Sequence, residues 1–224
     1  MLTRIENILN RDDLQQIASL TATAQWQSGH HSAGAHASDA KINQEMHQGG
    51  DSWKAINQLV VSKLYQHPEF QRAALPSKVS AAFVSRYSSG MQYQPHVDDP
   101  VMGSAAGRYR SDVAITVFLS DKDSYTGGEL RIHTRFGAVD VKLDAGSAVT
   151  YPASSLHEVT QITSGERLAC VLWAQSLVRS AEQREILSDL DEARQALHMS
   201  AKAAQVTDSV DRAYTNLLRM WSEV

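Results

Sequence analysis

The sequence contains very little cysteine, since Cys170 is the only one in 224 residues. A single cysteine cannot form a disulfide within the chain. Cys170 lies in the stretch Leu168-Ala-Cys-Val-Leu-Trp, which is typical of a buried strand, and nothing near it in the sequence would lower its pKa. We therefore expect an inert thiol in the core.

Long apolar runs and an excess of positive charge are also missing. No segment reaches the roughly eighteen consecutive apolar residues of a membrane span, and charges interrupt the apolar residues near the N-terminus, unlike in a signal peptide. The formal net charge of −4 gives no long-range attraction for nucleic acid or for an anionic membrane. We expect a cytoplasmic protein whose partner is neither nucleic acid nor a membrane, but a small molecule or a protein.

The length allows one substantial hydrophobic core with additions, but not two large domains. The hydrophobic pattern divides the chain into N-terminal helices and a loop (1–77), a β-rich domain (78–178) and C-terminal helices (179–224). We expect the two outer parts to pack on the β-rich domain. The apolar stripes of the C-terminal helices would equally suit another subunit, so a homo-oligomer is an open alternative.

The N-terminal part shows two helical segments. Asn10 can cap a first helix, and Asp13 favours the positive end of its dipole. A second apolar stripe at helical spacing runs from Ile56 to Leu64, and His67-Pro68 interrupts it.

Between these helices, the stretch from Gln27 to Gln48 is rich in Gly, Ser, Ala and His and has no apolar period. We predict a long loop. Its histidines match no structural zinc spacing, and no cysteine is present there to complete such a site. They are His30, His31, His36 and His47. A polar surface loop and a lid over an active site are the two interpretations.

From Val79 onward the apolar residues alternate, which predicts strands. Further alternating runs are separated by turns about every eight to twelve residues, with no helical period between them. They cover Val79 to Tyr87, Asp112 to Ser120, Leu130 to Leu143, Ser147 to Tyr151, His157 to Thr163 and Arg167 to Gln175. This pattern predicts a mainly β fold with flanking helices, in which the core is a double-sheet jelly roll.

One short stretch combines metal-ligand residues. His96 and Asp98 are two residues apart, and in extended backbone such residues point to the same face. His157 follows another predicted strand. Two histidines and one carboxylate make a facial triad that leaves coordination positions open, as in non-haem Fe(II) oxygenases.

A cation completes this hypothesis. Arg167 lies ten residues after His157, and a guanidinium binds carboxylates in a bidentate fork, so Arg167 suits the distal carboxylate of a dicarboxylate co-substrate. Two alternatives stay open. A catalytic zinc hydrolase also uses two histidines, a carboxylate and water, although it has no use for Arg167. A jelly roll can also bind a ligand without turnover.

Taken together, several short motifs resemble the Fe(II)/2-oxoglutarate oxygenases and, among them, the prolyl-hydroxylase-like bacterial PKHD-type hydroxylases. The motifs are Tyr87, His96-Val97-Asp98-Asp99-Pro100, Gly127-Gly128-Glu129-Leu130, Tyr151-Pro152, His157-Glu158-Val159 and Gly165-Glu166-Arg167. The closing Asn216-Leu-Leu-Arg-Met-Trp-Ser-Glu also looks like that group. The resemblance implies a double-stranded β-helix core and a hydroxylase that uses Fe(II), 2-oxoglutarate and O2, with L-ascorbate (vitamin C) as auxiliary reductant.

The resemblance also implies roles for individual residues. His96, Asp98 and His157 would bind iron, and no catalytic residue is implied beyond these ligands. Arg167 would hold the distal carboxylate of 2-oxoglutarate. Tyr87 looks like the tyrosine whose hydroxyl also binds that carboxylate, whereas Tyr93 would line the substrate side instead. The substrate would be a small molecule or a peptide. A link to iron acquisition is also implied.

Overall fold

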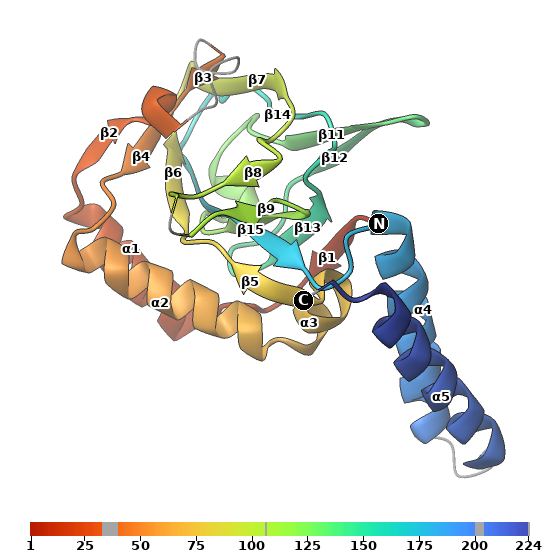
Figure 1. Cartoon of the computed structure of the whole chain (residues 1–224). Coiled ribbons are helices and arrows are strands. Elements are labelled where there is room, and N and C mark those ends of the chain that lie inside the picture. The colour runs from red at the N-terminus through yellow and green to blue at the C-terminus, as the bar shows by residue number, and fades with distance from the viewer. Residues whose placement is uncertain (33–39, 106, 200–203, 224) are drawn as a thin grey trace.

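The computed structural model describes residues 1–32, 40–105, 107–199 and 204–223. Two antiparallel β-sheets face each other, and helices flank the larger sheet (Figure 1). The prediction of a mainly β fold with flanking helices is therefore confirmed. Within the described residues, no helix combines the length and apolarity that crossing a membrane would require.

The larger sheet has eight strands. Its order is β1-β13-β10-β15-β6-β4-β2, and β5 pairs with β15. The strands are β1 (Thr3–Ile5), β2 (Trp26–Ser28), β4 (Gln44–Met46), β5 (Pro76–Val79), β6 (Phe83–Tyr87), β10 (Val113–Phe118), β13 (Ala148–Pro152) and β15 (Arg167–Ser176).

The smaller sheet has the order β12-β11-β14-β7-β3. Its strands are β3 (Lys41–Ile42), β7 (Gln92–His96), β11 (Leu130–Thr134), β12 (Gly137–Val141) and β14 (His157–Val159). A separate pair joins β8 (Val101–Met102) to β9 (Tyr109–Arg110). Two short 3-10 turns, Gly29–Ser32 and Lys122–Ser124, complete the connections.

Strand β10 shows why the larger sheet is buried on both faces. Val113, Ile115 and Val117 pack in one cluster with residues of the helices, whereas Ala114 and Phe118 pack toward the smaller sheet. The alternation along a strand puts these two sets on opposite faces. The same alternation on β15 places Arg167, Val171 and Trp173 on the face that lines the site.

Helices α1 (Arg11–Ala22), α2 (Asp51–Gln66) and α3 (Pro68–Ala74) cover the outer face of the larger sheet. Helix α1 begins as predicted. The side chain of Asn10 accepts a hydrogen bond from the Asp13 backbone, and the Asp13 carboxylate accepts one from the Asn10 backbone. Pro68 separates α2 from α3, because its ring and missing N–H are tolerated only in the first turn of a helix.

Helices α4 (Ala181–His198) and α5 (Ala204–Trp221) form a hairpin that extends away from the sheets in Figure 1. Leu187 of α4 packs with Leu75 and Val178, and Trp221 of α5 joins this cluster. Arg184 is buried at the base of the hairpin, where its guanidinium donates to the carbonyls of Val178 and Arg179 at 2.8 Å each. The division at 77/78 and 178/179 stays a prediction.

Two expectations about the N-terminal half are wrong in part. The predicted loop between Gln27 and Gln48 contains residues of β2, β3 and β4, which pair with one another or with β6 and β7. Their hydrogen bonds come from distant strands, so no local period reveals them. The strand predicted from Val79 to Tyr87 is instead two strands, β5 and β6. His36 lies outside the described residues.

Candidate active site

The two candidate histidines face each other on neighbouring strands of the smaller sheet. His157 begins β14 and His96 ends β7, and the two residues are direct partners in the antiparallel register. Their ring centroids are 4.3 Å apart. Cross-strand pairing therefore brings together two residues that are far apart in the sequence.

Hydrogen bonds to backbone carbonyls set the tautomer of both imidazoles. Nδ1 of His96 lies 2.8 Å from the Gln94 carbonyl, and Nδ1 of His157 lies 3.0 Å from the Ser155 carbonyl. A carbonyl only accepts, so each Nδ1 carries a proton, and in the neutral form of either ring Nε2 is the nitrogen with a free lone pair. Burial and the charge of His157 lower the pKa of His96 to about 3, which keeps this imidazole neutral.

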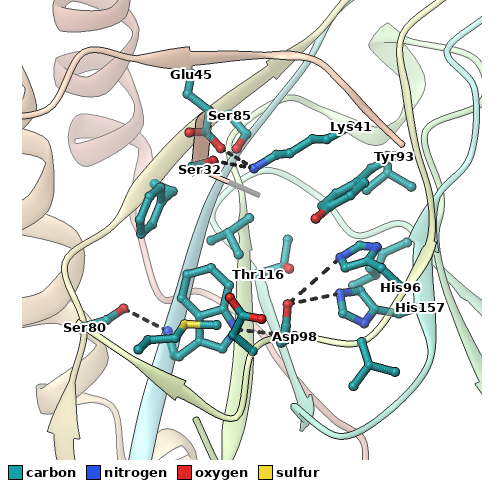
Figure 2. A pocket seen from close by; sticks show the side chains of 18 of the residues that line it. Ser32, Lys41, Glu45, Ser80, Ser85, Tyr93, His96, Asp98, Thr116 and His157 are labelled. Atoms are coloured by element: carbon teal, nitrogen blue, oxygen red, sulfur yellow. Dashed lines mark hydrogen bonds and ion pairs between the residues drawn. The ribbon is translucent and has the colours of Figure 1, made fainter. Parts of the chain in front are cut away.

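The Asp98 carboxylate completes the cluster from the segment that follows β7. Its Oδ1 lies 4.0 Å from Nε2 of His96 and 3.8 Å from Nε2 of His157 (Figure 2). Its Oδ2 accepts a hydrogen bond of 2.9 Å from the indole Nε1 of Trp173. Burial raises the pKa of Asp98, and the nearby His157 opposes that rise. Three free donor atoms therefore converge on one point.

Arg167 lies on the opposite sheet. It is the first residue of β15, pairs with Tyr87 at the end of β6, and has an exposed fraction of 1%. Its guanidinium carbon is 5.4 Å from the centroid of the Tyr87 ring. Among the described residues, its Nε has no hydrogen-bond acceptor. A buried guanidinium with an unused donor suits an anionic ligand.

Two tyrosines flank this guanidinium. Burial raises the pKa of both Tyr87 and Tyr125, and the positive charge of Arg167 opposes the rise in each case. Both hydroxyls are therefore protonated at neutral pH, which leaves them able to donate a hydrogen bond. Tyr125 was not predicted from the sequence.

One cavity joins the histidine cluster to Arg167. It has a volume of about 620 Å³, and Tyr87, Tyr93 and Trp173 line it together with the candidate ligands. Tyr93 stacks on the ring of His96 with a centroid distance of 3.6 Å. The cavity is within the range of small-molecule binding sites, which is about 300–1,000 Å³. All the site residues predicted from the sequence thus line a single cavity.

Polar residues from the predicted loop also reach the cavity. Lys41 lies beside Tyr93, and its Nζ is 2.5 Å from the Glu45 carboxylate and 2.7 Å from the Ser32 hydroxyl (Figure 2). The loop prediction missed Lys41 and Glu45, because only the pairing of β3 with β7 and of β4 with β6 places them there. Within the described residues, no loop histidine belongs to a group of metal-ligand side chains.

Comparisons with known proteins identify the family. Residues 82–175 match the family model of the 2OG-Fe(II) oxygenase superfamily, and residues 182–223 match that of the PKHD-type hydroxylase C-terminal domain. Over the full length of both chains, the sequence is 48% identical to PKHD-type hydroxylase Tgr7_2199 of Thioalkalivibrio sulfidiphilus and 42% identical to a PKHD-type hydroxylase of a Polaromonas species.

The chain belongs to the PKHD-type hydroxylase family.

Solved structures with a similar fold include two prolyl hydroxylases. A Pseudomonas putida prolyl-4-hydroxylase is similar with a TM-score of 0.51 and 19% identity, covering 78% of this chain and 92% of that one. A prolyl hydroxylase from Trichoplax adhaerens, solved with a hypoxia inducible factor peptide, has a TM-score of 0.53 and 17% identity, covering 84% and 86%. The predicted jelly-roll core is confirmed.

Membership in this family makes the protein an oxidoreductase, a dioxygenase of the Fe(II)/2-oxoglutarate class. Fe(II), 2-oxoglutarate and O2 are implied by the family. The donor set of His96, Asp98 and His157 fits the metal, because two histidines and one carboxylate are the ligands of facial Fe(II) sites. The zinc hydrolase and the non-catalytic module are not supported by the family.

Proposed function

We propose that this PKHD-type hydroxylase binds Fe(II) through His96, Asp98 and His157 and 2-oxoglutarate through Arg167 and Tyr87, and that it hydroxylates a C–H bond of its substrate. One observation carries the proposal. Three free donor atoms and a buried guanidinium with an unused Nε donor line the same cavity. A metal and a dianion would satisfy both sets of groups.

The histidines act as neutral ligands in this proposal. The Gln94 and Ser155 carbonyls hold the Nδ1 protons, so the Nε2 lone pairs of His96 and His157 stay directed at the metal. Bound Fe(II) would supply the activation of O2. With three ligands from the protein, the site would leave coordination positions open for the co-substrate and O2.

Arg167 binds and orients the co-substrate. Its fork would bind the distal carboxylate of 2-oxoglutarate through two parallel hydrogen bonds, and the protonated hydroxyl of Tyr87 would add a third. Burial of the pair excludes water, which strengthens the charge-assisted bonds. Arg167 would thus hold the distal end of the co-substrate and leave its keto-acid end directed toward His96, Asp98 and His157.

The proposed reaction balances as 2-oxoglutarate, O2 and a substrate R–H giving succinate, CO2 and R–OH. One oxygen atom enters succinate and the other enters the hydroxyl group. We expect L-ascorbate to support turnover by keeping the iron reduced, and we expect the reaction to occur in the cytoplasm.

The substrate is proposed to be a small molecule or a peptide. The cavity wall combines apolar and aromatic side chains, among them Phe83, Met102 and Trp173, with the exposed carboxylate of Asp99. Lys41 and Glu45, which form an ion pair, also line it. A role in iron acquisition is the biological context that we propose.

The test is succinate formation coupled to O2 uptake in the Fe(II)-loaded protein. Metabolites, siderophores and cytosolic proteins are screened, and mass spectrometry then locates the added oxygen. We expect substrate-dependent succinate in the wild-type protein and none in His157→Ala. Tight retention of zinc, with no succinate from any candidate, would contradict the proposal.

A further inference from the structure

We propose that Trp173 is a positioning residue for the metal centre, because its indole N–H fixes one oxygen of Asp98 and leaves the other as the single ligand atom. The inference rests on the proposed function, in which Asp98 binds the metal. Trp173 itself touches neither the metal nor the co-substrate in this role. It acts through the carboxylate.

The two oxygens of Asp98 have different surroundings. Oδ2 accepts the hydrogen bond from Nε1 of Trp173 at 2.9 Å. Oδ1 faces the Nε2 atoms of the two histidines at 4.0 and 3.8 Å. The hydrogen bond therefore makes the two oxygens different: the protein holds Oδ2, and Oδ1 stays free to bind the metal.

The rotation of the Asp98 carboxylate is set by its contacts, because the terminal torsion of an aspartate is broad and is not fixed by the backbone. The residue lies in the segment that follows the end of β7. Trp173 lies on β15 in the opposite sheet. Its hydrogen bond is thus a link from one sheet to the ligand segment of the other.

The indole is itself firmly held. The Trp173 backbone N–H donates to the Ser80 hydroxyl at 2.9 Å, and the Ser80 backbone N–H donates to the Trp173 carbonyl at 2.8 Å. The ring of Phe83 contacts the indole edge to face at 5.6 Å. A donor held at both backbone and ring can restrain the carboxylate, whereas a mobile donor would turn with it.

This restraint has a consequence for coordination. A carboxylate binds a metal through one oxygen or through both. If Oδ2 also reached the metal, it would occupy one of the positions that the co-substrate and O2 require. By holding Oδ2, Trp173 keeps the coordination monodentate and these positions open.

The test compares Trp173→Phe with the matched control Trp53→Phe. The indole of Trp53 also donates a hydrogen bond of 2.9 Å, but to the Ala82 carbonyl, where it does not touch a candidate ligand. Both proteins are loaded with Co(II) without oxygen. The visible Co(II) spectrum, the Kd for Co(II) and the Kd for 2-oxoglutarate of the Co(II) form are measured.

We expect Trp173→Phe to change the Co(II) spectrum and to weaken metal or co-substrate binding by about 10–100-fold, as is typical when a hydrogen bond to a metal ligand is lost. Trp53→Phe should keep the wild-type spectrum and both Kd values. If Trp173→Phe fails to fold, replacement of Trp173 by 3-benzothienylalanine, in which sulfur replaces the N–H, keeps the shape of the ring.

A wild-type spectrum and wild-type Kd values without the Trp173 N–H would overturn the inference. Failure of the proposed function looks different, because Asp98→Ala would then bind Co(II) as tightly as the wild-type protein. A fall in melting temperature alone, with an unchanged Co(II) spectrum, would assign Trp173 a packing role and also overturn the inference.

Discussion

A Cβ atom at Gly128 would lie 3.1 Å from Cδ of Arg167 and closer still to Cδ1 of Ile162. The backbone of Gly128 also has a φ of +69°, a conformation that favours glycine. Gly128 is therefore required by the space that Ile162, Tyr125 and Arg167 occupy together, and it belongs to the candidate site although it offers no functional group.

Substitution of Gly128→Ala should displace Ile162, and with it shift the adjacent side chains of Arg167 and Tyr125. We expect the KM for 2-oxoglutarate to rise by about tenfold, which corresponds to ~1.4 kcal/mol, while the Kd for iron stays near the wild-type value. Gly137→Ala is the matched control, since Gly137 also has a positive φ but nothing lies within 4 Å of the position that its Cβ would take. Equal changes in both variants would contradict this account.

Each of the variants His96→Ala, Asp98→Ala and His157→Ala should abolish turnover with little loss of folding, because three ligands fix the metal while leaving sites for co-substrate and O2. Asp98→Glu should also fail. Its extra methylene moves the carboxylate by a carbon–carbon bond, whereas metal sites tolerate only ~0.2 Å. Full activity of any one variant, measured with Fe(II) in modest excess, would remove that residue from the triad.

The base of the C-terminal hairpin should depend on Arg184. Its buried guanidinium donates to backbone carbonyls, so Arg184→Ala leaves buried acceptors without a donor and should lower the free energy of unfolding by about 2–3 kcal/mol. Denaturant unfolding measures the change. Arg212→Ala, on the exposed side of α5, should stay within about 0.5 kcal/mol of wild type. An equally small change in the free energy of unfolding for Arg184→Ala would contradict the structural role proposed for this residue.

Cys170 should be unreactive in the native protein. Burial raises the pKa of its thiol to about 12, so the nucleophilic thiolate is scarce at about pH 8, and the side chain is also inaccessible. Titration with a thiol reagent should find no reactive group until denaturant is added, and then one. Rapid labelling of the folded protein would show that this part of the core opens readily.

Much of the fold could be predicted because its signals are local. The alternation that predicted a strand from Asp112 to Ser120 is the pattern of β10, and the cap at Asn10 marks the start of α1. The pair His96 and Asp98 was also visible from its spacing, although Asp98 lies in the segment after β7 and not in the strand that the spacing suggested.

The remaining features depend on contacts between distant segments. Strands β3 and β4 are short and polar, and they adopt strand conformation because they pair with β7 and β6. The sequence alone indicates only that Trp173 belongs to a buried strand. The available signal was its even spacing from Arg167 on β15, which puts both side chains on the face toward the site, but the hydrogen bond to Asp98 arises only when the two sheets face each other.

Arg167 distinguishes this mechanism from a generic metal site. A charge-assisted hydrogen bond is worth roughly 1.5–3 kcal/mol, and a buried carboxylate left unpaired costs more. Arg167→Ala should therefore raise the KM for 2-oxoglutarate by about one to a few orders of magnitude, with iron affinity near wild type. Arg167→Lys should recover only part of the loss, because a point charge cannot reproduce the fork. Unchanged 2-oxoglutarate dependence, or loss of iron, would refute the assignment.

The most direct measurement is an anaerobic titration of the Fe(II)-loaded wild-type protein with 2-oxoglutarate, followed by visible absorbance. Chelation of the metal by the keto-acid end should produce a weak charge-transfer band that rises to saturation, and in Arg167→Ala the same band should require a higher concentration. If the wild-type protein gives no band and retains zinc tightly instead, the proposed Fe(II) and 2-oxoglutarate site is contradicted.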